Sequence, residues 1–293
     1  MKANFILLIV SVLLGSCTTR PQFVPTPDHV VVVIMENHGY DQIIGSDSAP
    51  YINSLAADSH AALFTHSLAI EHPSQGNYLY LFSGCRQNVI KDQTPTCLPF
   101  TTPNLGAELL HSGRTFTGYS EDLQSVGYTG DTFRNYARKH NPWVNWQGDS
   151  TNGIPAELNQ PFDSFPPNYS SLPTLSFVIP NLLDDMHGND AGSTPGPENG
   201  DRWLRDNLDG YIQWAKTHNS LLILTFDEDQ GEGDDKPTPI TTIFIGQMVK
   251  AGKYCEVIDH NRVLRTMEDM YHLPYAGRSK DCKSITDCWI TKK

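Results

Sequence analysis

The sequence has little positive charge and no hydrophobic run long enough to cross a membrane. Lysine and arginine total 21 against 33 acidic residues, which gives a formal net charge of -12. A protein that binds nucleic acid through its phosphates needs a basic excess, so we expect no nucleic-acid partner. The apolar run at residues 5–14 is too short for a spanning helix. With 39% hydrophobic and 18% charged residues, the chain is neither disordered nor a coiled coil.

Two metal-binding patterns are also missing. None of the cysteine spacings matches a zinc site. The acidic run at residues 227–235 fails as an EF-hand calcium loop, because its fifth position is Gly231 and its sixth, normally glycine, is Glu232.

The N-terminus has the pattern of an export signal. Lys2 precedes the apolar run, which ends in Leu14-Gly15-Ser16-Cys17 and resembles the lipobox of bacterial lipoproteins. We expect residues 1–16 to be a signal peptide and Cys17 to carry a lipid that anchors the exported protein at the periplasmic or cell-surface face of a membrane. The alternative is an ordinary secretory signal with an incidental cysteine. The proline-containing residues 17–27 would form a tether, and residues 28–293 a single domain.

Export changes the interpretation of the cysteines. An oxidising compartment favours disulfides, and five cysteines remain once Cys17 is set aside. The local pairs would be Cys85 with Cys97 and Cys282 with Cys288, leaving Cys255 unpaired. A pair of Cys255 with Cys282 or Cys288 is also open, because connectivity cannot be deduced from sequence alone.

Buried strands alternate with helices along the chain. Continuous apolar runs at residues 30–35, 175–179 and 221–226 indicate strands buried on both faces, as in a parallel sheet. Further strands are expected at 61–69, 115–119 and 241–245, and helices at 50–57, 74–82, 104–111, 201–216 and 260–273. The helix at 201–216 would be capped by Asp201. This order predicts an α/β fold with a mostly parallel central sheet and helices on both faces. Residues 141–173 are too irregular to assign and are interpreted as an insertion.

Polar residues follow several of the predicted strands directly. Glu36 and Asn37 come after the first, Asp184, Asp185 and His187 after the strand at 175–179, and Asp227 and Glu228 after the strand at 221–226. The carboxyl ends of parallel strands are where α/β folds place their sites. Carboxylate, amide and imidazole groups converging there indicate a divalent metal site, although each alone is more often a cap or turn residue.

Ser74 opens a predicted helix. It is either an ordinary N-cap or a nucleophile, because a helix N-terminus also favours a phosphate and a nearby metal lowers the pKa of a hydroxyl. Lys139 and His140, beside a turn, are either surface residues or ligands for a substrate phosphate.

Seven segments in order resemble the phosphoesterase family of acid phosphatases and phosphatidylcholine-type phospholipases C, within the alkaline phosphatase superfamily. The segments, which span roughly residues 28–275, are ENHGYDQIIG, HPSQGNYLYLFSG, YSEDL, YARKHNPWV, PNLLDDMHG, TFDEDQ and DHNRVLRTMEDMYHL. The resemblance implies a metal-dependent hydrolase that forms a phospho-enzyme. Carried over by motif, Ser74 would be the nucleophile and Asn77 would hold the phosphate. His72 and His140 would either support the metal ligands or assist the leaving group. The implied metal ligands are Glu36, Asn37, Asp185, His187, Asp227, Glu228 and His260. The metal could be Mg, Ca, Mn or Zn.

We therefore expect an exported acid phosphatase acting on small phosphate monoesters. A phosphodiesterase or phospholipase C remains an alternative, with phospholipid as substrate, if the loop containing Trp143 and Trp146 faces lipid rather than the core. A further alternative is a non-catalytic lipoprotein that binds a metal or a phosphate ligand.

Overall fold

The computed structural model describes residues 23–188, 196–231 and 237–291. The predicted signal peptide and Cys17 lie outside the described residues. Most of the described strands form a single sheet, and their bounds lie within a few residues of those expected from sequence. The strands are β1 His29–Met35, β2 Ala61–Leu68, β3 Phe116–Ser120, β4 Thr132–Phe133, β5 Tyr136–Ala137, β6 Asn159–Pro161, β7 Leu175–Ile179, β8 Ser220–Phe226, β9 Pro239–Ile245, β10 Gly252–Tyr254 and β11 Ile258–Asp259.

The helices fall into regular α-helices and short 3₁₀ turns. The α-helices are α1 Tyr40–Ile43, α2 Pro50–Ala56, α3 Ser74–Ser83, α4 Leu105–His111, α5 Pro197–Ala215 and α6 His260–Tyr271. The 3₁₀ turns are η1 Arg138–His140, η2 Pro142–Trp146, η3 Ala156–Leu158, η4 Phe162–Ser164, η5 Tyr169–Ser171 and η6 Gly277–Asp281.

The main sheet has the order β10-β2-β9-β8-β1-β7-β3-β6, with β11 also paired to β2. Among its described strands, β9 alone runs against the others, because it pairs antiparallel with both β8 and β2 while the remaining pairs are parallel. The carboxyl ends of β1, β2, β7 and β8 therefore share one edge of the sheet, which confirms the mostly parallel arrangement expected from sequence. The hairpin of β4 and β5 stands apart from this sheet.

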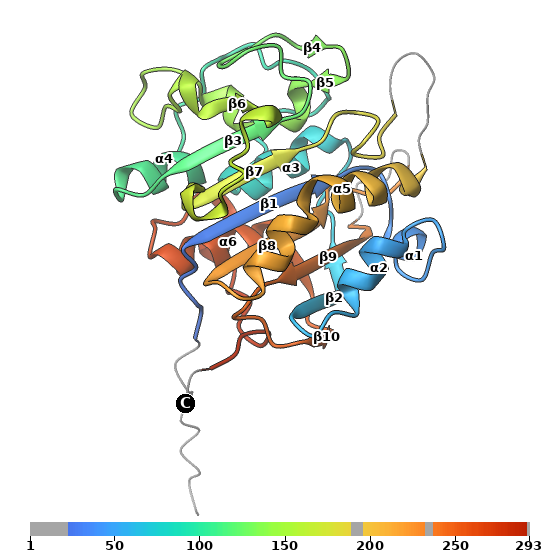
Figure 1. Ribbon diagram of the computed structural model, residues 1–293. Coiled ribbons are helices and arrows are strands. Elements are labelled where there is room, and N and C mark those ends of the chain that lie inside the picture. Colours follow the sequence, from blue (N-terminus) through green and yellow to red (C-terminus); the bar gives the residue numbers. More distant parts are fainter. Residues whose placement is uncertain (1–22, 189–195, 232–236, 292–293) are drawn as a thin grey trace, which may run out of the picture.

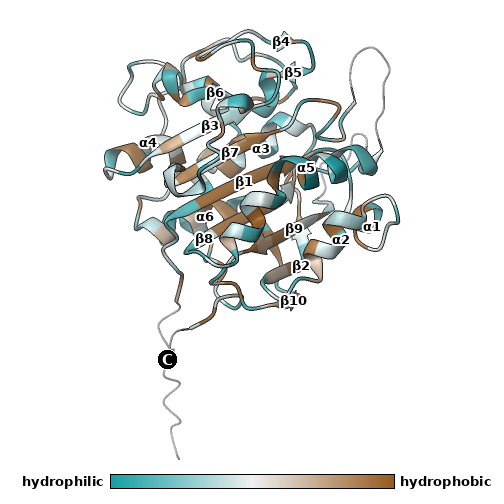
Figure 2. Cartoon of the chain, viewed as in Figure 1, coloured by the Kyte–Doolittle hydropathy of each residue, from teal (hydrophilic) through white to brown (hydrophobic). Residues whose placement is uncertain are grey.

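Helices cover both faces of the sheet (Figure 1). Helices α2 and α5 lie in front of it, and α3 and α6 lie behind. The side chains of β1 alternate between the two layers: Val30, Val32 and Ile34 join the core with α3 and α6, whereas Val31 and Val33 join the core with α5. Figure 2 shows the strands as a hydrophobic centre with more polar helices around them. The continuous apolar runs thus reflect burial on both faces.

The irregular segment at residues 141–173 contributes to the core. Its strand β6 extends the sheet by pairing in parallel with β3. Trp143 and Trp146 are fully buried, and the indole N–H of Trp143 donates to Asn159 Oδ1 at 2.9 Å. Trp143 packs so closely on β3 that a Cβ on Gly118 would lie 2.1 Å from its ring. The segment thus contributes to both the sheet and the core, and these tryptophans do not face lipid.

The sequence predicted that a helix begins at Asp201, but in the structure Asp201 lies inside helix α5. Helix α5 starts four residues earlier, with Pro197 in its first turn. The buried Asp201 carboxylate accepts hydrogen bonds from the backbone N–H groups of Tyr51 at 3.0 Å and Ile52 at 2.7 Å. It therefore caps the N-terminus of α2, a neighbour in space that the sequence pattern could not identify.

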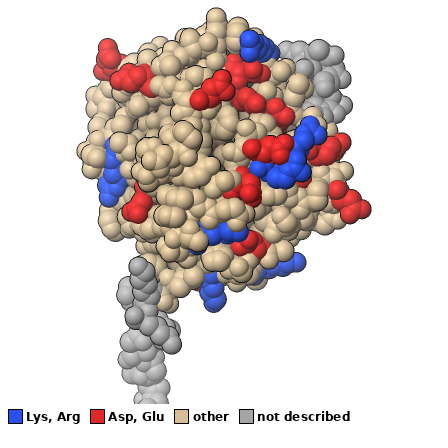
Figure 3. Space-filling view, in the orientation of Figure 1, with Lys and Arg blue, Asp and Glu red and all other residues tan. Residues whose placement is uncertain are grey.

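The described cysteines are all free thiols, namely Cys85, Cys97, Cys255, Cys282 and Cys288. Neither of the two local disulfides expected from the spacing is therefore formed. Within the described ranges, no helix is both long enough and apolar enough to cross a membrane. On the face in Figure 3, acidic and basic side chains are interspersed and form no basic patch.

Candidate active site

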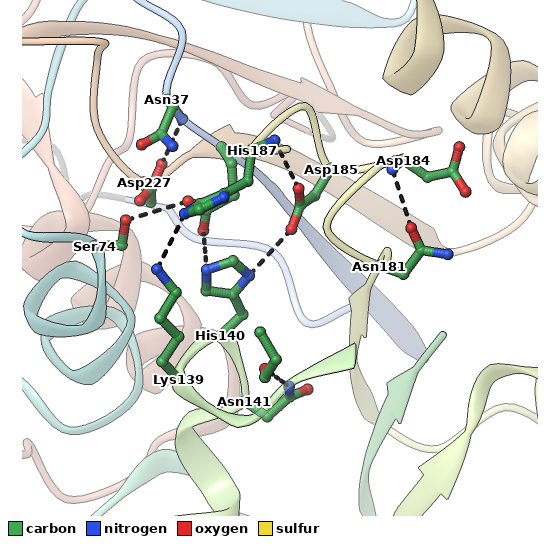
Figure 4. A network of polar contacts seen from close by, with 12 residues as sticks. Asn37, Ser74, Lys139, His140, Asn141, Asn181, Asp184, Asp185, His187 and Asp227 are labelled. Atoms are coloured by element: carbon green, nitrogen blue, oxygen red, sulfur yellow. Dashed lines mark hydrogen bonds and ion pairs between the residues drawn. The ribbon is translucent and has the colours of Figure 1, made fainter. Parts of the chain in front are cut away.

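The polar residues after three parallel strands do meet at one edge of the sheet. Glu36 directly follows β1, and Asp227 and Glu228 directly follow β8, its neighbour in the sheet. Asp185 comes from the turn after β7, the neighbour on the other side of β1. The backbone ties these ends together, because Glu36 N–H donates to Asp185 O at 2.8 Å and Asp227 N–H donates to Met35 O at 3.0 Å. The predicted convergence is thus found (Figure 4).

Ser74 points into this group of carboxylates. It is the first residue of α3, and its side chain makes no capping bond, since Pro73 occupies the N-cap position. The Ser74 hydroxyl lies 3.0 Å from Glu228 Oε1 and 3.2 Å from Glu36 Oε2. It is also almost completely buried. The interpretation of Ser74 as an ordinary cap is therefore wrong, because its hydroxyl lies within hydrogen-bond distance of two carboxyl groups of the cluster.

His140 is wedged between two buried carboxylates. Its Nδ1 lies 3.0 Å from Asp185 Oδ2, and its Nε2 lies 3.3 Å from Glu36 Oε1. Burial, aided by the charge of Lys139, holds the pKa of His140 well below its usual value, so the imidazole is neutral. A neutral imidazole whose Nδ1 faces a carboxylate keeps its Nε2 available as a ligand. The geometry therefore favours direct metal binding by His140 over both roles expected from sequence, support of the metal ligands and assistance to the leaving group.

His187 lies beside His140, with the ring centroids 5.4 Å apart. Its Nδ1 is 2.8 Å from the carbonyl oxygen of Gly188 and must donate there, so Nε2 is the acceptor nitrogen. Lys139 approaches this Nε2 with its Nζ at 3.0 Å and also pairs with Asp92 Oδ2 at 2.7 Å. Burial opposes a charged Lys139, but Glu36 and Asp92 outweigh it and raise its pKa. The ammonium group is thus charged and close to the cluster.

The surroundings raise the pKa of all four carboxyl groups. Burial, followed by the charges of neighbouring acids, raises the pKa of Glu36 and Asp185 well above the ordinary values. Burial raises the pKa of Asp227 to about 6, and burial together with Asp227 raises that of Glu228 to about 9. Like charges this close cannot all ionise without a compensating cation. Perturbed carboxyl groups gathered in one place are typical of a functional site.

The residues fit a divalent cation. Glu36, His140 and His187 each place a possible ligand atom within 4.8 Å of the other two. Asp227 Oδ2 is buried and has no hydrogen-bond partner among the described residues. Carboxylate oxygens with imidazole nitrogens suit several divalent metals. This group could therefore hold a metal ion, which would also relieve the repulsion between the carboxylates.

Other predicted residues surround the site rather than enter it. The Nδ1 and Nε2 atoms of His72 lie 3.0 Å from Glu228 Oε2 and 3.2 Å from Asp229 Oδ1. The amide of Asn77 donates to Glu71 O at 2.6 Å and to Glu228 Oε2 at 3.3 Å, which fixes the loop before Ser74. His260 is buried with its Nε2 2.9 Å from the backbone carbonyl of Asp227 rather than from the carboxylate. These contacts position the acids after β8.

Two turns at the site have unusual backbone angles. Asn37, after Glu36, has φ of 56°, and Met186, between Asp185 and His187, has φ of 80°. Non-glycine residues rarely adopt this left-handed region, and such outliers gather at functional sites. In this conformation the backbone N–H of Asn37 donates to Asp227 Oδ1 at 3.0 Å. Both turns therefore aim polar groups at the cluster.

Two members of the site were missed from sequence. Tyr78 donates its hydroxyl to Glu36 Oε1 and stacks on His140, with ring centroids 5.2 Å apart. Its position four residues after Ser74, on the same helix face, was a usable signal. Asp92 holds both Lys139 and the backbone N–H of Gln75, at 3.0 Å. Its loop has no regular pattern, so nothing in the sequence pointed to it.

A buried serine hydroxyl, an acidic cluster and three residues that could hold a metal ion meet at the carboxyl edge of an α/β sheet, an arrangement typical of a hydrolytic enzyme. Over residues 46–274 the chain matches the model of the Phosphoesterase family, and it belongs to that family. It is thus a phosphoric ester hydrolase, as the sequence motifs implied.

Curated relatives agree with this assignment. The chain is 45% identical over 267 residues to a phosphatidylinositol-3-phosphatase from Mycobacterium tuberculosis, covering 90% of this chain and 84% of that protein. It is 26% identical to an acid phosphatase from Aspergillus fumigatus over 261 residues, 84% of this chain, but spans only 55% of that relative's length.

Solved structures confirm the fold. A member of the alkaline phosphatase superfamily from Vibrio parahaemolyticus superposes with a TM-score of 0.58 at 13% identity, covering 90% of this chain and 72% of that one. A sulfatase from Pseudoalteromonas superposes with a TM-score of 0.55 at 13% identity, covering 86% and 70%. At these identities the likeness concerns the fold alone.

Proposed function

We propose that this protein is an exported, metal-dependent phosphomonoesterase in which Ser74 is the nucleophile. The observation that carries the proposal is the burial of the Ser74 hydroxyl at the first residue of α3, within 3.2 Å of both Glu36 and Glu228. The positive end of the α3 helix dipole favours a phosphate at this point. An acceptor for the proton, a place for the phosphate and the attacking oxygen thus coincide.

In the proposed reaction, Ser74 Oγ attacks phosphorus and its proton passes to a neighbouring carboxylate. The bond between phosphorus and the ester oxygen breaks, and the leaving alcohol takes up a proton. Water then attacks the phosphoserine, which releases inorganic phosphate and restores the hydroxyl. Lys139, whose ammonium lies beside His187, stabilises charge on the phosphate oxygens. Asn77 holds the loop that carries Ser74, by its bonds to Glu71 and Glu228.

We assign Glu36, His140 and His187 as the core of the metal site, with Asp227 and Glu228 beside it. A divalent ion bound there would lower the pKa of the Ser74 hydroxyl and offset the negative charge of the phosphate. Both oxygens of Asp185 are already engaged, by the Nδ1 atom of His140 at 3.0 Å and the backbone N–H of His187 at 2.8 Å. We therefore assign Asp185 as the residue that orients the two histidines.

A monoester is favoured over a diester by two observations. The relative with 45% identity is named for removing a phosphate from phosphatidylinositol 3-phosphate. The tryptophan loop that could have supported a phospholipase C is instead part of the core. The test is turnover of a phosphomonoester, a phosphodiester and phosphatidylcholine by the purified protein. We expect rapid release of phosphate from the monoester alone, and a faster reaction with either of the others would contradict the proposal.

We also propose export and lipidation at Cys17, on the strength of the Leu14-Gly15-Ser16-Cys17 motif. Detergent-phase partitioning of the wild type and of Cys17→Ala, expressed in a bacterium, tests this. The wild type should enter the detergent phase and the variant should remain aqueous. If both proteins stayed in the aqueous phase, Cys17 would not be lipidated, and the N-terminus would be an ordinary secretory signal or no signal at all.

A further inference from the structure

A cavity of about 200 Å³ opens beside the candidate active site. Lys139 and His187 line its inner end, together with Gln75, the residue after Ser74. The outer wall is polar and comes from two segments, the loop after α3 and the start of the β4–β5 hairpin. Its main members are Asp92, Gln93, Thr94, Asp131 and Thr132. The cavity therefore continues from the groups that would hold the phosphate to the protein surface.

Hydrogen bonds hold this wall together. Asp92 accepts from Lys139 Nζ at 2.7 Å and from the backbone N–H of Gln75 at 3.0 Å. The backbone N–H of Gln93 donates to Gln75 Oε1 at 2.9 Å. Thr94 donates its hydroxyl to Asp131, which joins the two segments. Bonds from the wall to the nucleophile segment fix the cavity relative to Ser74, as a pre-organised binding site requires.

The charges that line the cavity are balanced. Lys139 is paired with Asp92, and the charge of Asp131 acts on Arg138. A second anionic group would meet two carboxylates, and the described lining residues include no Phe, Tyr or Trp, which a cage for a quaternary ammonium needs. The cavity thus suits an uncharged group.

The polar lining matches hydroxyl groups in particular. A hydroxyl both donates and accepts, so it is recognised by carboxylates, amides and other hydroxyls, which are the groups in this wall. At the inner end, the Nε2 atom of Gln75 is buried without a hydrogen-bond partner among the described residues. A buried donor left unpaired is costly, and an oxygen atom of a ligand would satisfy it.

We propose that this cavity is the leaving-group subsite and that it selects an uncharged polyhydroxylated ring, such as an inositol or a sugar. This inference rests on the proposed phosphomonoesterase function. The volume of about 200 Å³ is below that of pockets for drug-sized ligands, roughly 300–1,000 Å³, so it accommodates one ring while any acyl chains remain outside. Asp131 and Thr132, which lie apart from the catalytic cluster, are the specificity-determining residues.

The first test compares two soluble monoesters with the same ring size, myo-inositol 3-phosphate and cyclohexyl phosphate. Sites built to hydrogen-bond hydroxyls discriminate strongly against analogues that lack them. We expect kcat/KM to be at least about 100-fold higher for the inositol ester, and equal values would overturn the subsite. Vesicles that contain phosphatidylinositol 3-phosphate form a separate arm. If kcat/KM for the vesicles is similar to or higher than that for myo-inositol 3-phosphate, the occupant of the subsite is a lipid headgroup. If it is much lower, the occupant is a free polyol phosphate.

The second test uses Asp131→Ala, with Asp163→Ala as a control at an exposed acid outside the cavity. Loss of one hydrogen bond to a charged group should lower kcat/KM for the inositol ester by about 10- to 100-fold. Cyclohexyl phosphate and ethyl phosphate should change by less than about twofold, and the control should be unchanged for all three esters. A parallel loss for all three esters in Asp131→Ala would show a merely structural role and overturn the proposal.

Thr132→Trp provides an independent variant that fills the cavity. It should abolish hydrolysis of the inositol ester and retain that of ethyl phosphate, which also reports that the protein is folded. Retained hydrolysis of the inositol ester would overturn the subsite. A wild type that hydrolyses none of these monoesters would instead contradict the proposed function itself, so the two failures are distinguishable.

Discussion

Two of the regions that contain buried carboxylates differ in their surroundings. At the carboxyl edge of the sheet, Glu36, Asp185, Asp227 and Glu228 are crowded together, and Asp227 Oδ2 has no partner among the described residues. In α6, Glu268 is buried alone, and its two oxygens accept from the backbone N–H of Ala276 at 2.7 Å and from the Ser279 hydroxyl at 2.5 Å.

The difference separates a site from a structural support. Glu268 ties α6 to η6, and its environment is complete as it stands. The edge of the sheet gathers like charges that destabilise one another unless a cation and a substrate are present, an arrangement that a protein keeps only where chemistry needs it. Substitutions at the edge should therefore affect turnover, and substitutions at the structural acids should affect unfolding.

The largest expected effect is that of Ser74→Ala. Without the nucleophile, kcat should fall by several powers of ten, equivalent to about 4–8 kcal/mol of transition-state stabilisation, while the fold is retained because Ser74 caps nothing. Acid-quenched mixtures with labelled substrate should no longer contain phosphoprotein. Ser83→Ala, a buried serine at the far end of the same helix, is the matched control and should keep its activity. If Ser74→Ala retained a tenth of the wild-type rate, the nucleophile would have to be another group.

Metal removal should have the next largest effect. A divalent ion at 100 times its dissociation constant should stabilise the folded protein by about 2.7 kcal/mol, because it binds the native cluster and not the unfolded chain. Thermal unfolding of chelated protein, followed by separate addition of Mg, Ca, Mn and Zn, measures this gain. Glu36→Gln should show little or no gain with any of them. An unchanged unfolding temperature of the wild type with all four ions would contradict the metal site.

The effect of Glu268→Gln on the free energy of unfolding should depend on pH. Burial raises the pKa of Glu268 to about 7, from an ordinary value near 4.5. Between these values the folded state keeps a proton that the unfolded chain has lost, so the contribution of Glu268 to stability is complete below about pH 4.5 and is lost as the pH rises through 7. The neutral Gln variant should therefore be more stable than wild type at pH 8, by about 1–3 kcal/mol, and similar to it at pH 4.5. Urea unfolding at both values checks this, and a Gln variant that is less stable at pH 8 would show an ionised, well-stabilised carboxylate.

Asp201→Ala should have the smallest effect. Loss of the acceptor for the N–H groups of Tyr51 and Ile52 should lower the free energy of unfolding by about 0.5–2 kcal/mol, the usual cost of a lost helix cap. Asp206→Ala, an exposed acid on the same helix, is the control. Denaturant unfolding measures both variants, and kcat should not change in either. A fall in kcat for Asp201→Ala would mean that α2 also supports the active site.

The sequence predicted the elements that buried apolar runs define. The strands β1, β7 and β8 came from continuous β-branched and aliphatic runs, and Glu36 and Asp227 followed them directly, so both the edge and its acids were predictable. Local signals at helix ends were less reliable. Aspartate is a common N-cap residue, and Asp201 does cap a helix, but that helix is α2 and not α5. The capping group needs only to be near the helix end in space.

What the sequence by itself determined is the order of strands and helices and therefore the edge at which polar residues gather, because periodicity and burial are local properties. The tertiary structure alone decided the partners. Ser74 reaches Glu228, which is 154 residues away, and Lys139 reaches both Asp92 and His187. The burial that raises the carboxyl pKa values and the cavity bounded by Asp131 arise only when these segments pack together, since desolvation and shape depend on every neighbour in space.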